Sequence, residues 1–150
     1  KDKFEQMSPG KKAFIVLKLI LDFSDSKIPV LIDQPEDSLD NRAIYNELTA
    51  YIKKTKLNRQ IILVTHNPNI VVAGDCENVI VANQESDVSK NKNGKVFDYV
   101  SGALESIVKD EKSQFLLQRY SIKEHVCDIL EGGRIAFLKR ESKYDLQEEL

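Results

Sequence analysis

The sequence predicts an α/β fold in which a mostly parallel sheet is flanked by helices. Three short apolar runs, at residues 29–33, 60–65 and 78–82, have the length of buried strands. The segments between them carry the periodicity and the capping residues of helices. Strands that alternate with helices form β-α-β units, whose strands run parallel and are covered on both faces.

The composition agrees with a globular protein. The 150 residues are 41% apolar and 31% charged, with a formal net charge of −2, so overall charge gives no argument for a nucleic-acid or membrane partner. Cys76 and Cys127 form no metal-binding or CxxC spacing, which leads us to expect a reducing, cytoplasmic setting. No apolar run reaches membrane-spanning length. Because the chain starts at Lys1 without a methionine, we interpret it as a piece of a longer protein.

Two helices are predicted in the first third of the chain. Ser8 suits an N-cap and Pro9 suits the first helical position. The apolar run at residues 13–23 exceeds a typical strand and therefore predicts a largely buried helix. A second helix is expected over about residues 41–56, capped by Asp40 or Asn41. The apolar side chains of its inner face recur every four residues: Ile44, Leu48 and Ile52.

The organisation changes after the third strand. A short helix that Asn67 and Pro68 begin separates the second and third strands. A polar loop then fills residues 84–95, and an edge strand is expected at 96–100, followed by a helical segment at 101–109. We therefore divide the chain into a lobe at 1–84 and, at 85–150, a loop, edge strand and helical tail packed on the same domain.

Two features mark the start and the end of a helix in the tail. Ser121 with Glu124 three residues later is a capping box and predicts a helix start. Gly132 and Gly133 then interrupt or end that helix before a last one at residues 135–144.

Two polar residues are expected at one edge of the sheet, where ligands of parallel sheets gather. Asp33 closes the first strand and His66 follows the second. A strand-end aspartate can hold Mg²⁺ together with water and phosphate, and His66 could contact a phosphate or orient a water. Taken singly, Asp33 is more often a turn former and His66 a structural residue.

The segment from Ser8 to Lys11 has the same ambiguity. On its own it is a helix cap with a proline. It would also suit an anion, because free N–H groups, the positive end of the helix dipole, a hydroxyl and Lys11 face one point. Gly10 would let a ligand approach the backbone closely.

Four segments in order resemble the motifs of the ABC-type ATPases. Residues 7–11 (MSPGK) resemble the signature motif, usually LSGGQ, and residues 30–33 (VLID) look like the Walker B strand. Residues 33–40 (DQPEDSLD) line up with DEPTSALD, which covers Walker B and the D-loop. Residues 62–66 (ILVTH) are similar to the strand that carries the switch histidine. The order and the separations of the four segments are those of the family.

The resemblance is narrower than the whole family. The amino-acid sequences of these segments are similar to those of the ATPase heads of SMC, RecF and RecN-type proteins. They are most similar to the bacterial TrlF-like ATPases, in which the head accompanies a PHP-type phosphoesterase domain. The resemblance implies a P-loop NTPase fold and an ATPase that acts on DNA or RNA, in repair or in phage defence. No GxxxxGK[ST] motif occurs in the chain. The resemblance therefore implies an N-terminal lobe that carries Walker A, and an inactive chain without it.

The resemblance also implies a dimer. Two heads would pair head to tail around two ATP molecules with Mg²⁺, with no part for a membrane. Ser8, Gly10 and Lys11 of one head would meet the γ-phosphate bound by the other, and Asp40 would lie at the dimer seam. Asp33 would hold Mg²⁺ through water.

Gln34 departs from the family, which places its catalytic glutamate there. A neutral amide can orient water but cannot accept its proton. Three interpretations compete: Gln34 positions water in a slow ATPase, Glu36 supplies the carboxylate, or the head holds ATP with hardly any turnover. We favour slow turnover with help from Glu36, with His66 in contact with the γ-phosphate.

Two further hypotheses stay open beside the ATPase head. One is a non-hydrolysing clamp that dimerises on ATP, for which Gln34 is the argument. The other is a nucleotide-binding subunit of a transporter. In the tail, His125 and Cys127 face different sides of a helix and so predict packing rather than a metal. The lysines of the polar loop, at 90, 92 and 95, are expected to be solvated, with a lesser chance of contacting phosphate.

Overall fold

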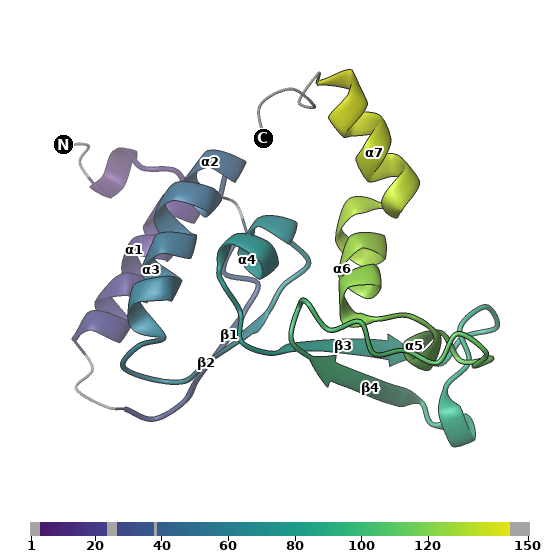
Figure 1. Ribbon diagram of the computed structural model, residues 1–150. Coiled ribbons are helices and arrows are strands. Elements are labelled where there is room, and N and C mark those ends of the chain that lie inside the picture. Colours follow the sequence, from purple (N-terminus) through teal and green to yellow (C-terminus); the bar gives the residue numbers. More distant parts are fainter. Residues whose placement is uncertain (1–3, 24–26, 38, 145–150) are drawn as a thin grey trace. The chain divides into compact units, whose positions relative to one another are not determined.

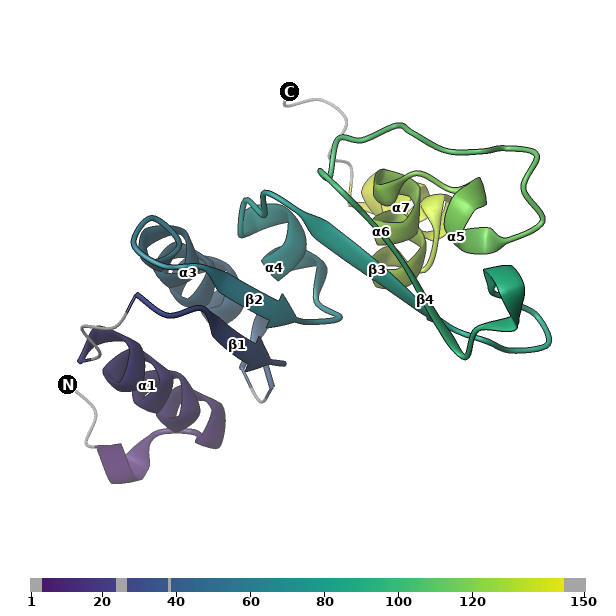
Figure 2. The same ribbon diagram turned by 90° about the horizontal axis from the view of Figure 1, so that it is seen from below.

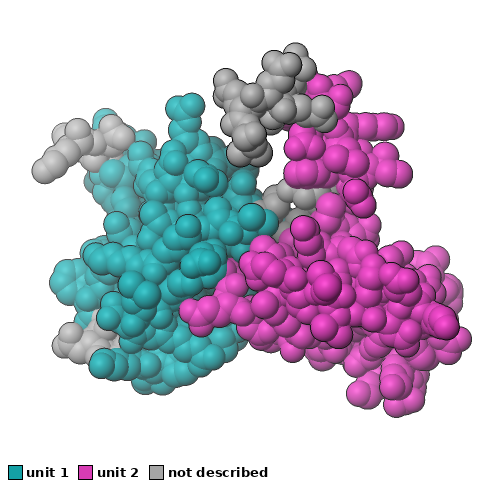
Figure 3. All heavy atoms as spheres, in the orientation of Figure 1, with its two compact units in different colours: residues 1–75 teal, residues 76–150 magenta. Residues whose placement is uncertain are grey.

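The computed structural model describes residues 4–23, 27–37 and 39–144 (Figure 1). The chain divides into two compact units, residues 1–75 and 76–150 (Figure 3). Ser38, inside the DQPEDSLD segment, lies outside the described residues.

Unit 1 alternates helices with two strands. Its elements are η1 (Phe4–Gln6), α1 (Pro9–Asp22), β1 (Val30–Asp33), α2 (Asn41–Ala43), η2 (Ile44–Leu48), α3 (Thr49–Thr55), β2 (Ile61–Val64) and α4 (Pro68–Ala73). Ser8 caps α1 with Pro9 in its first turn, as predicted. The predicted helix over residues 41–56 is present as α2, η2 and α3, of which η2 is a π-helical turn. The hydroxyl of Thr49 donates to the Tyr45 carbonyl across this wider turn.

The core of unit 1 lies between its helices and one face of the strands. Its buried side chains come from α1, η2, α3 and α4: Phe14, Ile44, Leu48, Ile52 and Ile70. The predicted inner face of the second helix is therefore confirmed. Ile61 and Leu63 of β2 pack against this cluster. Figure 1 shows α1, α3 and α4 on the same side of β1 and β2.

The strands β1 and β2 are parallel, with Val30 opposite Ile61 and Asp33 opposite Val64. The expectation of helices on both faces is wrong for the described residues. Side chains that alternate with the half-buried ones point away from the core and are exposed: Leu31 by 70%, Ile62 by 43% and Val64 by 51%. Figure 2, seen from below, shows β1 and β2 with no helix in front of them. The helices that build the core of unit 1 pack on the opposite face, so no described helix of this unit covers the apolar face.

The helix α1 is also less buried than expected. Phe14 and Leu21 are buried, whereas four apolar side chains on its other side are exposed: Val16, Leu19, Ile20 and Phe23. The run of apolar residues at 13–23 thus covers two sides of the helix, and only one of them meets the core.

Unit 2 contains an antiparallel strand pair and three helices. Its elements are β3 (Val79–Gln84), η3 (Lys92–Gly94), β4 (Phe97–Gly102), α5 (Leu116–Arg119), α6 (Ile122–Glu131) and α7 (Arg134–Lys143). Val79 pairs with Gly102 and Gln84 with Phe97. With one parallel and one antiparallel pair, the strands of the described residues do not form the mostly parallel sheet that we expected.

The third predicted strand, β3, pairs with β4 and not with β1 or β2, and the loop that joins β3 to β4 sets the antiparallel direction of this pair. A parallel return needs a crossover connection, usually with a helix. This loop instead folds back around Asn91, which is buried and donates to the Lys95 and Val96 carbonyls. Asn83 of β3 donates to the Asn91 side chain at 2.7 Å. The buried amide closes the loop, so that β4 runs back along β3.

The helix expected at residues 101–109 is absent. Ser101 and Gly102 are instead the last residues of β4, and the chain is irregular from there to α5. A Cβ on Gly102 would meet Ile122 Cγ1 at 3.3 Å, so the strand end lies close against α6. In the tail, the capping box of Ser121 and Glu124 is confirmed, and α6 ends at the predicted glycine pair. No helix in the described parts of the chain is long and apolar enough to cross a membrane.

Candidate functional site

The carboxyl ends of β1 and β2 bring three of the predicted residues to one edge of the strand pair. Asp33 ends β1 opposite Val64. The Gln34 N–H continues the ladder by donating to the Val64 carbonyl at 2.8 Å. His66 lies two residues after Val64, just beyond the end of β2. The short parallel ladder therefore sets Asp33, Gln34 and His66 beside one another, as the sequence predicts.

Gln34 leaves the strand in a left-handed conformation, with φ of 45°. A side chain with a Cβ seldom adopts this region, which costs on the order of 1–3 kcal/mol. The Gln34 carbonyl accepts from the Asp37 N–H at 3.2 Å, so the strain belongs to a tight turn. The side-chain amide nitrogen of Gln34, Nε2, lies 3.3 Å from Nδ1 of His66.

Glu36 is the third residue of this turn and its side chain is buried, with 5% of the residue's surface exposed. Its Oε1 accepts from the Thr65 hydroxyl at 2.5 Å and from the His66 N–H at 3.3 Å. The same oxygen lies 3.8 Å from His66 Nδ1. Oε2 is buried and makes no hydrogen bond with the described residues. The carboxylate therefore binds the segment that joins β2 to α4.

Thr65 is a site residue that the sequence analysis missed. Besides donating to Glu36, its hydroxyl accepts from the Asn67 N–H at 3.0 Å. The signal was a hydroxyl between an apolar strand and a polar turn, but its acid partner is 29 residues away in the sequence. Periodicity and spacing do not report such a long-range pair.

The Asp33 carboxylate is exposed and makes no hydrogen bond or ion pair with another residue that the structure describes. Within the same residues, no three His, Cys, Asp or Glu side chains come together as a metal site. A single exposed carboxylate still fits Mg²⁺, because this ion keeps several waters and uses one or two carboxylates with phosphate oxygens.

The start of α1 forms a second group with the segment before α2. The Ser8 hydroxyl accepts from the Lys11 N–H at 3.3 Å, and Gly10 is buried in the first turn. Asp40 caps α2 by accepting from the Ala43 N–H at 2.8 Å. Ser8, Lys11 and Asp40 line one pocket of about 200 Å³.

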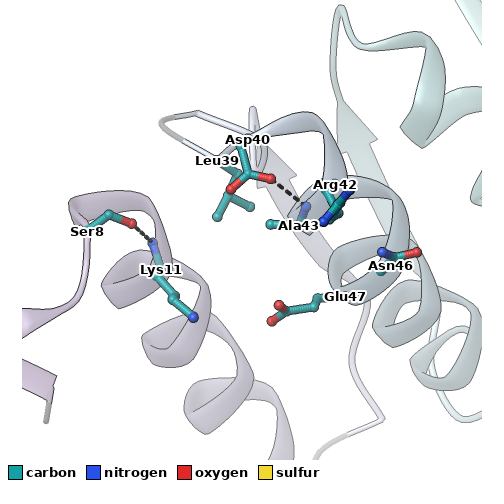
Figure 4. A pocket seen from close by; sticks show the side chains of 8 residues that line it. All are labelled: Ser8, Lys11, Leu39, Asp40, Arg42, Ala43, Asn46 and Glu47. Carbon is teal, nitrogen blue, oxygen red and sulfur yellow. Dashed lines mark hydrogen bonds between the residues drawn. The ribbon is translucent and has the colours of Figure 1, made fainter. Parts of the chain in front are cut away.

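The pocket also contains residues that the sequence analysis did not select. Its lining is Ser8, Lys11, Leu39, Asp40, Arg42, Ala43, Asn46 and Glu47 (Figure 4). Figure 4 shows the Glu47 carboxylate directed toward α1, where Ser8 and Lys11 lie. Two cationic and two acidic side chains line the pocket, so its charges balance. Arg42 and Glu47 lie two and seven residues beyond Asp40, and no motif marks them.

The predicted residues thus fall into two groups. Asp33, Gln34, Glu36 and His66 gather at the strand ends, whereas Ser8, Gly10, Lys11 and Asp40 gather at the start of α1. Every one of these residues lies in unit 1.

The described residues of the basic loop and of the tail form no cluster of metal-binding side chains. Lys90 lies 3.5 Å from Glu85 and 3.7 Å from Asp87, and Lys95 lies 3.9 Å from Asp98. These acids offset the positive charge of the loop. His125 is a core residue of unit 2, where its Nε2 lies 3.2 Å from the Leu117 carbonyl.

Comparisons with known proteins support the fold. No protein-family model matches the chain, and no curated protein matches it. A solved structure from work on the ATP-driven dimerization and DNA-stimulated activation of SMC ATPases is similar, with a TM-score of 0.53 and 24% sequence identity. The match covers 69% of this chain and 59% of that chain. The chain therefore has a mixed α/β fold that resembles part of an SMC ATPase. The narrower resemblance to TrlF-like ATPases stays a prediction.

Proposed function

We propose that this chain is the C-terminal lobe of an ATP-binding and ATP-hydrolysing head of the ABC type. The observation that carries the proposal is the edge at which Asp33, Gln34 and His66 meet, on strands whose fold resembles an SMC ATPase. An acid, a water-orienting amide and a histidine at one sheet edge suit phosphoryl transfer, which needs positioning and charge stabilisation more than covalent chemistry.

In this proposal each residue of the edge has its own task. Asp33 would hold Mg²⁺ through water, and the bound ion would neutralise charge on the phosphate oxygens. Gln34 would orient the attacking water, and His66 would donate to the γ-phosphate. An amide cannot accept the proton of the water, so we expect turnover to be slow.

The second group would serve the neighbouring head. Ser8, Gly10 and Lys11 would approach the γ-phosphate held by the other head, where the positive end of a 14-residue helix favours an anion. Asp40 would lie at the seam between the heads. The pocket that Ser8, Lys11 and Asp40 line supports this arrangement, because it brings the two motifs together before any partner binds.

An N-terminal lobe with the Walker A loop is the second partner in the proposal. The uncovered face of β1 and β2, with Leu31, Ile62 and Val64 exposed, supports it. An exposed apolar strand face is unfavourable in water and marks a surface that another element covers. Without that lobe, we expect the chain to bind ATP weakly and to hydrolyse none.

A second candidate function is an ATP-held clamp that hardly hydrolyses. The observation in its favour is that Gln34 is neutral while the nearest carboxylate, that of Glu36, is buried against Thr65 and His66. Neither group has an obvious path to take a proton from water. The two functions share ATP binding and dimerisation, and they differ in turnover.

The first experiment tests the part that both functions share. Sedimentation velocity of the intact protein should show a dimer with ATP and Mg²⁺, and a monomer with ADP. Ser8→Arg places a bulky cation at the start of α1 and should abolish the ATP-dependent dimer. Asn58→Arg adds the same charge at an exposed position away from the pocket, and should leave it intact. A protein that neither binds ATP nor responds to the Ser8 change would contradict the proposal.

Action on DNA or RNA, in repair or defence, is a further part of the proposal. Its support is the structural similarity to an SMC ATPase, together with the amino-acid sequences of the motifs. Duplex DNA, single-stranded DNA and RNA should be compared for their effect on ATP turnover by the intact protein. Turnover that no nucleic acid changes would count against this part alone.

A further inference from the structure

The two ring nitrogens of His66 lie in different environments, one near other side chains and the other without a partner among the described residues. Its side chain is 68% exposed, so one side of the ring faces solvent. Nδ1 faces inward and lies 3.3 Å from the Gln34 amide nitrogen and 3.8 Å from Glu36 Oε1. Nε2 makes no hydrogen bond with any residue in the described ranges. The neighbouring side chains that the structure describes can therefore influence the protonation of Nδ1 directly, but not that of Nε2.

The chemistry of the amide selects the tautomer of the ring. An amide nitrogen only donates, so the Gln34 contact requires Nδ1 to accept and places the single proton of the neutral ring on Nε2. A carboxylate at position 34 would reverse this, because it only accepts and would draw the proton to Nδ1. Glutamine in place of the usual glutamate thus leaves the outer nitrogen as a donor.

Glu36 acts on the same histidine through the main chain. Its Oε1 accepts from the His66 N–H and from the Thr65 hydroxyl, and so fixes the turn that carries the ring. At 3.8 Å, Glu36 is beyond hydrogen-bonding distance of Nδ1 but would attract a proton there. The amide of Gln34, which is closer, opposes that attraction.

We propose that Gln34 and Glu36 are positioning residues for His66: the Gln34 amide keeps Nδ1 unprotonated, Glu36 holds the main chain, and Nε2–H faces outward as a donor to a phosphate oxygen. The identity of this ligand rests on the proposed function, whereas the tautomer does not. The inference also gives Gln34 a task besides orienting water. The strained φ of Gln34 is then the conformation that directs its amide to the ring.

Nitrogen NMR of the imidazole rings tests the inference on these 150 residues. The chain has two histidines, His66 and His125, so the ring signals are simple to assign. His125 provides a reference, because its Nε2 faces the Leu117 carbonyl and must carry the proton. At about pH 9, where an ordinary histidine is neutral, His66 should show the Nε2–H tautomer. A wild-type His66 with its proton on Nδ1 would overturn the inference.

Two variants of Gln34 make the test specific. Gln34→Glu should move His66 toward the Nδ1–H tautomer. Gln34→Met has a similar size but no donor, and should give a mixture of the two. Because Gln34 is exposed, both variants should fold. Ring signals that stay the same in all three proteins would show that Gln34 does not control His66.

The Glu36 variants separate positioning from packing. Glu36→Gln keeps an acceptor oxygen and should preserve the slow hydrogen exchange of the His66 N–H, whereas Glu36→Ala should speed it at least tenfold. Equal exchange in both variants would contradict the role of Glu36. Failure of this inference is distinct from failure of the proposed function. If the Gln34 variants change the His66 tautomer but the protein does not bind ATP, the positioning role stands and the proposed function is contradicted. If the protein hydrolyses ATP but the tautomer does not change, the proposed function stands and the positioning role is contradicted.

Discussion

Removing the Thr65 hydroxyl tests how the candidate site is held together. In Thr65→Val, the buried Glu36 carboxylate loses a donor at 2.5 Å, and the Asn67 N–H loses an acceptor at 3.0 Å. A hydrogen bond to a charged group contributes about 1.5–3 kcal/mol, and an unpaired N–H that water partly reaches adds roughly 1 kcal/mol. The change should therefore destabilise unit 1 by about 2–4 kcal/mol.

Hydrogen exchange measures this loss of stability, because the exchange rates of β2 amides report on unit 1 alone. Amides of residues 61–67 should exchange about 30-fold to 1,000-fold faster in Thr65→Val, if they open with the unit. Thr55→Val is the matched control. Its hydroxyl donates to the Tyr51 carbonyl within the helix and touches no buried charge, so the change should cost no more than about 1 kcal/mol. If Thr65→Val costs no more than Thr55→Val, Glu36 does not depend on Thr65 and the account of the site is wrong.

Three other predictions concern the stability of the two units. Ser121→Ala removes the cap of α6 and should cost about 1 kcal/mol, seen in thermal unfolding as a fall in the Tm of unit 2 of roughly 4–8 °C. The Lys109 ammonium and then the Ser121 N–H hold the pKa of Glu124 at about 2 instead of 4.5. Its contribution to stability should thus be present above about pH 4.5 and be lost as the pH falls toward 2. Glu124→Gln should flatten the acid limb of a plot of Tm against pH, and an unchanged limb would exclude this carboxylate as a cause. Leu48→Ala, at a side chain with 0% exposure, should cost about 3–5 kcal/mol in urea unfolding, against less than about 0.5 kcal/mol for Leu57→Ala at 80% exposure.

Local signals in the sequence were sufficient for much of unit 1. The cap at Ser8, the inner face of the second helix and the placement of Asp33 and His66 at strand ends depend on residues close together in the chain. Four-residue periodicity and capping chemistry are determined within a turn or two of helix. The structure confirms those elements.

Other features depend on contacts between distant residues and could not be predicted in this way. The burial of Glu36 requires Thr65, and the contact of Gln34 with His66 requires a left-handed turn at a residue other than glycine. In unit 2, the direction of β4 depends on the buried side chain of Asn91, which reads in the sequence as one polar loop residue among many. Composition and spacing do not distinguish that asparagine from its exposed neighbours.

Steady-state ATP turnover by the intact protein, beside its Gln34→Glu and His66→Ala variants, tests the central claim most directly. We predict slow but measurable hydrolysis by the wild type, below about 1 s⁻¹, near the bottom of the usual range for enzymes. His66→Ala should abolish it, because the donor to the phosphate is lost. A silent wild type that Gln34→Glu activates would identify an ATP-held clamp. A protein that is silent in all three forms and does not bind ATP would contradict the claim that this chain belongs to an ATPase head.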